Sequence, residues 1–485
     1  MNRAATRRRR PASRRLDTIW VAVGVRHPRH LPLPRAAVDA PYPHVYASVT
    51  NRAGTCTLTK EAIAAMTTTL RRPSSSSRSP LSAADVAATR QPTERAHTLP
   101  ARAYHDPEVF AFEQEQWFTT EWLFVGREED LPELGSYFLT HVAGENIVVV
   151  RGGDGVVRAF HNVCRHRGST MLEEPCGQLV RFQCPYHAWI YDLQGRLRPP
   201  RHTETLENFT TDKNSLFAVQ LAAWQGLLFL NLAADAVPFE EHIGEFPSHF
   251  ERFPLAELRR VKRLEYDVCA NWKALMENYA ECYHCPGVHP LLNHLTPYDL
   301  GGYLPGAGQW AASWMELVGE AETLSIDGHL NGRTPIPGMN AADLRRVYYA
   351  WIWPNMLFSL HPDYLMTHQV WPVDAEQSKV VCELYFHPET MAQADFDASG
   401  PSEFWDLTNR QDWHVCQLQQ SGTRSRAYTP GRYSAIERMV HSFDAKVADR
   451  YADDGVITEV VRPPKKEFGA ARAKRAVSEE RRSAD

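Results

Sequence analysis

Residues 164–187 read CRHRGSTMLEEPCGQLVRFQCPYH, and this stretch decides the first half of the fold. It contains a Cys-x-His pair, Cys164 and His166, and after 17 further residues a Cys-x-x-His pair, Cys184 and His187. Each pair is short enough to lie on a tight loop at the tip of a β-hairpin. Two such loops can close on a single metal centre.

Two kinds of metal site are compatible with two thiolates and two imidazoles. A structural Zn²⁺ takes four such ligands in a tetrahedron, whereas a Rieske [2Fe–2S] cluster has two Cys on one iron and two His on the other. Zinc fingers usually take both Cys from one knuckle and both His from another element. Here each arm supplies one Cys and one His, as a two-iron cluster requires if each arm serves both irons. The spacing therefore favours a [2Fe–2S] cluster, with zinc as the alternative.

Short strands and turns are predicted around this motif. Between residues 122 and 232, apolar runs alternate with turn residues, as at Gly152-Gly153-Asp154-Gly155. Glycine-rich turns between apolar runs indicate β-hairpins. The earlier segment Asp106-Pro107-Glu108 is typical of a helix start, since Asp caps a helix and Pro is tolerated at its first position. We expect a leading helix and a small antiparallel β domain within residues 104–235.

A second motif lies in residues 271–290, which read NWKALMENYAECYHCPGVHP. The apolar spacing predicts a helix whose one face carries Glu277, Glu281 and His284 at positions i, i+4 and i+7. A proline two residues further on ends this helix, and the chain can then turn so that His289 lies beside His284. Two His and one carboxylate are the ligand set that holds Fe(II) with open positions for O₂ and substrate.

The carboxylate ligand of such a site has to come from elsewhere in the chain. Residues 404–413 read FWDLTNRQDW and offer two candidates, Asp406 and Asp412. Simpler interpretations exist for the local residues, since a lone His284 is often a buried core histidine and Glu277 could be a solvated helix charge. The residues alone leave both aspartates open as the third ligand.

The second motif begins about 90 residues after the first. Together, in this order, the two motifs resemble the catalytic α subunit of Rieske non-haem iron oxygenases over roughly residues 104–451. The resemblance implies an α+β fold, with an N-terminal antiparallel β Rieske domain over 104–235. A C-terminal helix-grip-like catalytic domain, with an antiparallel sheet and helices, would follow over 239–460. From composition, we expect residues 1–100 to be a disordered or mis-called N-terminal extension and linker, and residues 461–485 to be a mobile tail.

The resemblance also implies a role for each candidate residue. Asp412 is preferred to Asp406 as the third iron ligand, because the residues after it resemble the ligand-bearing helix of the family. Glu281 stands where family members have an acidic residue that bridges an iron ligand, here His284, and a cluster ligand of the neighbouring subunit, here His187. The implied cluster ligands are Cys164, His166, Cys184 and His187, the iron ligands are His284, His289 and Asp412, and the catalytic residues are Glu281 and Asn278.

The resemblance implies partners as well. Such oxygenases form head-to-tail homotrimers, use O₂ and receive electrons from a separate NAD(P)H-dependent flavin and iron–sulfur reductase, in some cases through a ferredoxin. The sequence is consistent with a separate reductase, because it contains neither a Gly-x-Gly-x-x-Gly dinucleotide motif nor a plant-type ferredoxin Cys run.

The substrate class is indicated by two features. Many ring-hydroxylating members have Asp at the bridging position, whereas Glu281 and the string Glu-Cys-Tyr-His-Cys resemble the branch that oxidises choline, carnitine and glycine betaine. Aromatic faces bind quaternary ammonium ions through cation–π attraction. Five aromatic residues on two predicted strands, at 347–360 and 364–371, could form such a pocket: Tyr348, Tyr349, Trp351, Trp353 and Trp371. The alternatives are that these rings are core residues or that they bind an aromatic substrate for ring hydroxylation.

Composition excludes several other classes of protein. The 485 residues carry a net charge of −5 and include no apolar run long enough for a membrane helix. Residues 1–65 are basic, with 11 Arg and one Lys against three acidic residues, so the remainder is acidic and does not suggest nucleic-acid binding. We interpret the basic head as an unstructured extension, with an organelle transit peptide as the alternative. Cysteines beside histidines indicate a reducing compartment, and we expect a cytoplasmic protein without membrane or nucleic-acid partners.

Overall fold

The structure, a computed structural model, describes residues 78–452. The expected mobile tail at 461–485, and residues 1–77 of the expected extension, lie outside this described part.

Residues 78–100 belong to the fold, and the expectation that they precede it is wrong. Leu81, Val86 and Leu99 are almost fully buried. The hydroxyl of Thr93 lies 2.8 Å from Nδ1 of His441, more than three hundred residues later in the chain. The apolar residues of this segment are too scattered to show a helical or strand period, so pattern analysis could not detect them.

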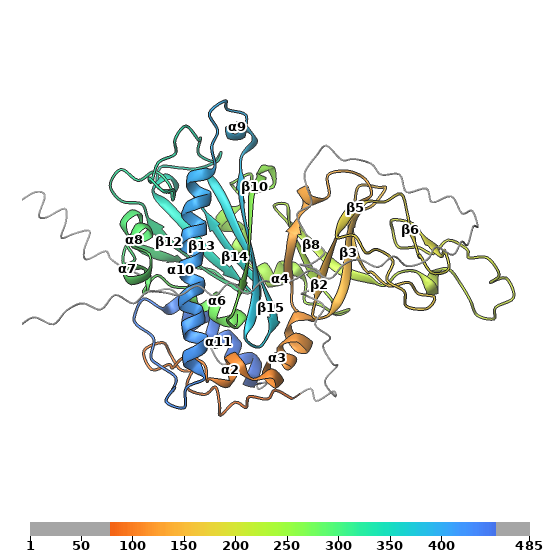
Figure 1. Cartoon of the computed structure of the whole chain (residues 1–485), viewed down its shortest axis with the longest axis horizontal. Coiled ribbons are helices and arrows are strands. Elements are labelled where there is room, and N and C mark those ends of the chain that lie inside the picture. The colour runs from red at the N-terminus through yellow and green to blue at the C-terminus, as the bar shows by residue number, and fades with distance from the viewer. Residues whose placement is uncertain (1–77, 453–485) are drawn as a thin grey trace, which may run out of the picture. The chain divides into compact units, whose positions relative to one another are not determined.

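The first sheet is antiparallel and has the strand order β1-β9-β8-β4-β3-β2-β5. As expected, the glycine-rich turn at 152–155 joins two neighbouring strands, and Gly155 adopts the positive φ of +81° that favours glycine. A separate two-stranded ribbon, β6-β7, extends from this part of the chain (Figure 1). The strands are β1 Leu123–Arg127, β2 Ser136–Val142, β3 Glu145–Arg151, β4 Val157–His161, β5 Cys176–Gln178, β6 Phe182–Gln183, β7 Ile190–Tyr191, β8 Ala218–Trp224 and β9 Leu227–Asn231.

The second sheet is also antiparallel and has the order β10-β16-β15-β14-β13-β12-β11. The single strand predicted over residues 347–360 is in fact two strands, with a turn at 353–355 that contains Pro354. Proline has no amide hydrogen and cannot continue a strand ladder. The strands are β10 Arg259–Val268, β11 Gly301–Leu304, β12 Trp310–Glu316, β13 Arg346–Ile352, β14 Met356–Leu360, β15 Tyr364–Asp374 and β16 Gln377–Phe386.

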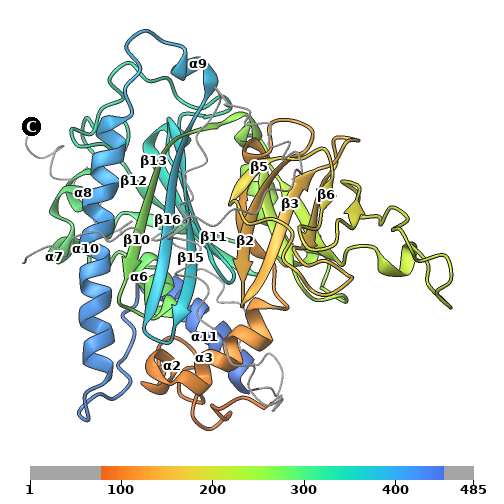
Figure 2. The same cartoon turned by 45° about the vertical axis from the view of Figure 1, so that its right-hand side comes forward.

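Three longer helices pack against this second sheet. The 25-residue α10 runs along it and contacts β10, while α6 contacts β15, α10 and α11 (Figures 1 and 2). None of the helices in residues 78–452 is long and apolar enough to cross a membrane. The helices are α2 Arg102–His105, α3 Pro107–Glu113, α4 Phe239–Ile243, α5 Phe246–Phe250, α6 Trp272–Tyr279, α7 Cys285–Val288, α8 Pro290–Leu295, α9 Pro388–Met391, α10 Ser399–Thr423 and α11 Arg438–Ala452.

Helix α3 begins as the sequence predicts and then anchors α6. Asp106 caps α3 by accepting a hydrogen bond from the backbone N–H of Glu108, at 2.9 Å. At the other end, the fully buried carboxylate of Glu113 forms an ion pair with Nζ of Lys273, at 2.5 Å. The same carboxylate accepts hydrogen bonds from the indole of Trp272 and the hydroxyl of Tyr451. One carboxylate therefore ties α3, α6 and α11 together.

We expect the substitution Glu113→Ala to lower the free energy of unfolding by about 3–5 kcal/mol, because it leaves the buried Lys273 ammonium without its partner. Denaturant unfolding of the two proteins measures this difference. Glu115→Ala, which removes an exposed carboxylate two residues further along, should change the free energy by less than about 0.5 kcal/mol. Equal effects of the two substitutions would show that the buried pair does not anchor α6.

Candidate metal centres and active-site cavity

The first constellation consists of two loops with matching backbone geometry. In one loop the N–H of Gly168 donates to the carbonyl of Cys164, at 3.0 Å, and in the other the N–H of Ala188 donates to the carbonyl of Cys184, at 3.1 Å. Gly168 and Ala188 both have positive φ, at +71° and +55°, which lets each loop turn back tightly. The two loops thus present their side chains in the same way, as the sequence predicts.

The side chains of these loops separate by type. The sulfurs of Cys164 and Cys184 are buried in contact with each other. The rings of His166 and His187 are exposed, with centroids 4.6 Å apart. Two adjacent thiols beneath two adjacent imidazoles fit a cluster that has Cys on one iron and His on the other. A tetrahedral zinc would instead need all four groups around one point.

Two neighbouring aromatic residues support these candidate ligands. The hydroxyl of Tyr191 lies 3.4 Å from Sγ of Cys164 and accepts a hydrogen bond from the N–H of Arg165. The indole of Trp189 stacks on the ring of His166, with centroids 4.7 Å apart. A Tyr or Trp two to five residues after a loop is equally typical of a strand core, so the sequence alone does not reveal these roles.

The helix predicted to carry the second constellation is shorter than expected. Helix α6 ends at Tyr279, and a turn follows before α7 begins at Cys285. Glu281 and His284 therefore lie on this turn, and the prediction that they share a helix face with Glu277 is wrong. Proline is favoured in the first turn of a helix, and here it starts α7 instead of ending α6.

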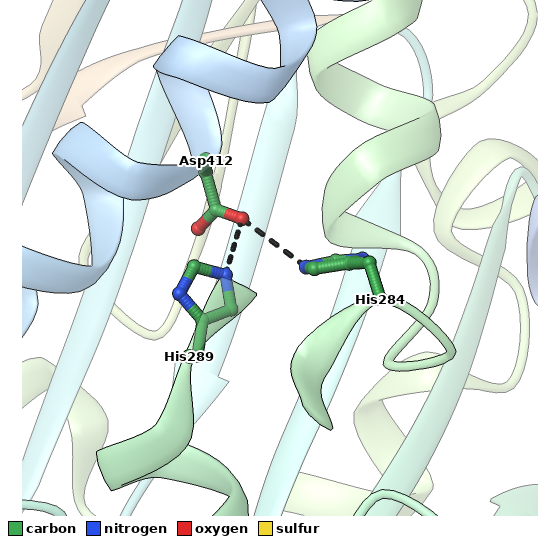
Figure 3. A group of neighbouring side chains, drawn as sticks. All are labelled: His284, His289 and Asp412. Carbon is green, nitrogen blue, oxygen red and sulfur yellow. Dashed lines mark hydrogen bonds and ion pairs between the residues drawn. The ribbon is translucent and has the colours of Figure 1, made fainter. Parts of the chain in front are cut away.

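The structure brings together His284, His289 and Asp412 (Figure 3). Oδ1 of Asp412 lies 2.7 Å from Nε2 of His289 and 3.3 Å from Nε2 of His284. One ligand atom from each residue lies within 4.8 Å of the others. Burial alone would raise the pKa of Asp412, but its hydrogen bonds with the two histidines lower that pKa to about 2. Two imidazole nitrogens and an ionised carboxylate are the donor set that suits Fe(II) with open positions.

The other nitrogen of each imidazole is held by a neighbouring side chain. Nδ1 of His284 lies 2.5 Å from Oε1 of Glu281, and Nδ1 of His289 lies 2.8 Å from Oε1 of Gln411. A carboxylate and an amide oxygen can only accept, so both Nδ1 atoms carry the proton and both Nε2 atoms face the shared centre. Gln411 was not identified from the sequence, although its position next to Asp412 on α10 was the available signal.

The other candidate residues lie apart from this centre. Asp406 accepts hydrogen bonds from Tyr266 and Arg410, each at 2.9 Å. Six residues of helix turn the side chain through about 600°, so Asp406 and Asp412 point in different directions from α10. Glu277 is neither solvated nor beside the histidines. It is buried and accepts a hydrogen bond from Tyr104.

A cavity of about 60 Å³ adjoins the three clustered residues. Its lining includes Asn278, Glu281 and the aromatic residues Tyr279, Tyr298, Tyr303, Tyr349 and Trp405. No Lys or Arg is among the described residues that line it.

Only Tyr349 of the five aromatic residues expected in the pocket lines this cavity. Trp351 and Trp353 pack on Phe443 in the core, with ring centroids 5.7 and 5.6 Å apart. Neighbouring residues on a strand point to opposite faces of the sheet, so Tyr348 lies in the other core cluster. Pattern analysis located the right strand but could not say which of its rings reach the site.

Two segments of the chain match known protein families. Residues 121–210 match the family described as the Rieske [2Fe-2S] domain, and residues 255–453 match the ring hydroxylating alpha subunit (catalytic domain). The class defined by fold and site is therefore an O₂-dependent oxidoreductase with a [2Fe–2S] cluster and a mononuclear iron. The chain belongs to the Rieske oxygenase family as an oxygenase subunit, which takes electrons from a separate reductase.

Several relatives share most of their length with the chain. The glycine betaine monooxygenase oxygenase subunit of Chromohalobacter salexigens is 30% identical over 371 residues, which cover 70% of this chain and 82% of the relative. The carnitine monooxygenase oxygenase subunit of Escherichia coli (strain K12) is 30% identical over 339 residues, covering 69% and 86%. A crystal structure of the quaternary ammonium Rieske monooxygenase CntA with L-carnitine matches with a TM-score of 0.61 and 26% identity, covering 74% of this chain and 96% of that one.

Mutation of a residue that hydrogen-bonds to a metal ligand typically weakens metal binding by roughly 10–100-fold. We expect Asp412→Ala, which removes a ligand itself, to weaken iron binding by more than this. Metal analysis after dialysis against a weak chelator measures the iron that remains. Asp406→Ala is the matched control on the same helix and should retain all of it. Greater loss of iron from the Asp406 variant would transfer the ligand role to that residue.

His284→Ala should abolish oxygenation while the visible spectrum of the [2Fe–2S] cluster stays unchanged, because the cluster loops share no side chain with residues 284–289. Disappearance of the cluster spectrum together with activity would contradict the separation of the two sites.

Proposed function

We propose that this chain is the terminal oxygenase component that uses O₂ and reductase-derived electrons to hydroxylate or N-demethylate a small quaternary ammonium compound. Betaine-, carnitine- and choline-like molecules are the candidate substrates. The names of the related oxygenase subunits support this class, and so does the structural match to CntA with L-carnitine.

The observation that carries this proposal is the composition of the cavity beside His284, His289 and Asp412. Five aromatic side chains line it, its acidic lining residues are Glu281 and Asp412, and no described lining residue is Lys or Arg. Aromatic faces and carboxylates attract a cation, and each aromatic contact contributes about 0.5–2 kcal/mol.

The size of the cavity bears on the alternative, an aromatic ring-hydroxylating oxygenase. At about 10–15 Å³ for each water-sized group, 60 Å³ holds four to six such groups. A trimethylammonium head fits this space better than a fused-ring arene does.

The side chains of the site divide into ligands and supports. We assign His284, His289 and Asp412 as iron ligands, and bound iron supplies the activation of O₂ next to the substrate. Glu281 and Gln411 hold the Nδ1 protons, so that the Nε2 atoms stay available to the metal. We assign the cluster to Cys164, His166, Cys184 and His187. Asn278, which lines the cavity, is assigned to the catalytic machinery as well.

We assign Glu281 to electron transfer between subunits of a head-to-tail homotrimer. The exposed rings of His166 and His187 support this assignment, since ligands that face outwards can meet a neighbouring subunit. One oxygen of Glu281 already contacts Nδ1 of His284, and the bridge requires a second contact with His187 of that neighbour. We further assign a flavin and iron–sulfur reductase, with or without a ferredoxin, as electron donor, and the cytoplasm as location.

The proposed function is tested with the purified protein and a reductase of this oxygenase class. Metal analysis and the reduced-state EPR spectrum should show three irons per chain and a Rieske signal. NADH-dependent formation of formaldehyde or of a hydroxylated product is then compared for choline, glycine betaine, carnitine and naphthalene. Turnover of naphthalene but of none of the three ammonium compounds would favour the aromatic alternative.

We expect Glu281→Gln to retain iron but to slow electron delivery, because an amide does not carry the charge of the bridging carboxylate. Stopped-flow oxidation of the reduced cluster in the presence of O₂ and substrate measures this step. Glu281→Asp keeps the charge and should recover part of the rate. An unchanged rate in the Gln variant would refute the bridging role.

A further inference from the structure

Two buried carboxyl groups, which the proposed function leaves without a role, meet between α6 and α11. Glu277 on α6 is 7% exposed and Asp444 on α11 is 1% exposed. The hydroxyl of Tyr104 donates to Oε1 of Glu277 at 2.8 Å, and the side-chain amide of Gln419 donates to its Oε2 at 3.3 Å. The hydroxyl of Tyr433 donates to Oδ2 of Asp444 at 2.5 Å.

The contact between these two groups requires a proton. The carboxyl groups of Glu277 and Asp444 lie within hydrogen-bonding reach of each other, and a carboxylate has no hydrogen to donate. Oδ1 of Asp444 is buried and has no donor among the described residues. Two buried carboxylates in contact repel each other strongly, so one proton on the pair is the stable state.

Burial and mutual repulsion favour this proton, while the nearby Lys273 ammonium opposes it. Burial raises the pKa of Glu277 to about 7, and burial together with the negative charge of Glu277 raises the pKa of Asp444 well above its ordinary value. The cation that faces the pair, Lys273, is already paired with Glu113. Other titratable neighbours are the hydroxyls of Tyr104, Tyr428, Tyr433 and Tyr451 and the thiol of Cys416.

A second cavity adjoins both the pair and the wall of the substrate cavity. It has a volume of about 210 Å³, enough for a chain of water molecules, and both Glu277 and Asp444 line it. Asn278, Glu281 and His284 line this cavity and also the substrate cavity, so they form a common wall. Thr98 and Glu437, which are only half-buried, lie on its lining as well and mark the way to solvent.

The reaction class creates a need for protons at this place. Oxygenation of one C–H bond consumes one O₂, two electrons and two protons, and yields one C–OH group and one water. The reductase supplies the electrons, whereas the protons have to come from solvent.

We propose that Glu277 and Asp444 share a transferable proton and pass it through the 210 Å³ cavity to the wall formed by Asn278, Glu281 and His284, where O₂ is reduced. Solvent then restores the proton at the pair through the same cavity. The proposal rests on the oxygenase activity of the proposed function and is independent of which substrate the enzyme takes.

The variants Glu277→Gln and Asp444→Asn test this relay, because they keep size and hydrogen bonding but remove the exchangeable proton. We expect unchanged iron content, cluster spectrum and substrate Kd, with kcat lower on the order of 10²-fold and a larger solvent deuterium isotope effect on kcat. More of the reduced O₂ should appear as H₂O₂ instead of product. Asp449→Asn, an equivalent change on α11 at a residue paired with Arg90 and outside the cavity lining, should leave all of these values unchanged.

A second readout does not depend on turnover. Infrared difference spectra of the protein without mononuclear iron should show the C=O stretch of a protonated carboxylic acid at pH 7, and this band should be missing in the Asp444→Asn variant. Absence of the band from the unsubstituted protein would overturn the proposal, as would an unchanged isotope effect or loss of iron in both variants. If no ammonium compound is oxidised by the unsubstituted protein, the proposed substrate class fails, while the infrared result still decides the state of the pair.

Discussion

The contact between Asp412 and two imidazoles depends on how the rest of the catalytic domain positions its helices. Its members are His284 and His289, on either side of α7, and a residue of a helix more than a hundred residues later. Their ligand atoms lie within 4.8 Å of one another. Such a contact is useful only if α6 and α10 keep a fixed separation. The structure achieves this by packing both helices on one antiparallel sheet and by fastening the start of α6 to Glu113. The precision of a metal site is thus a property of the helices behind it.

Much of this arrangement follows from the sequence because all assigned ligands except Asp412 occur in two short motifs. The short Cys-x-His and Cys-x-x-His spacings at Cys164 and Cys184 require tight loops, so the loops could be predicted from sequence. The turn-forming residues at 152–155 and the cap at Asp106 are equally local signals, and both predictions are confirmed. Family resemblance favours Asp412 over Asp406, and the structure places Asp412, on a different side of α10 from Asp406, beside the two histidines.

The predictions that failed depended on long-range packing. The end of α6 at Tyr279 is not marked by a helix breaker, so the periodic pattern continued past it. Glu277 looks like a surface charge in sequence, and only its contacts with Tyr104 and Gln419 show that it is buried. The aromatic residues of β13 alternate between two cores and the cavity, and their assignment depends on what each face of the sheet meets. Residues 78–100 are held by contacts with α11, to which no local pattern points.

The anchoring of α6 by α3 also bears on what counts as a domain in this protein. Glu113 and Tyr104 lie before the Rieske domain and the catalytic domain, yet the first holds the beginning of α6 and the second contacts its last turn. A helix of eight residues is about 12 Å long, so both of its ends are fixed by a segment that neither domain includes. The smallest fragment able to keep its iron-binding geometry is therefore longer than the two domains delimited by sequence similarity. Exchanging only those domains between relatives would separate the ligands from their support.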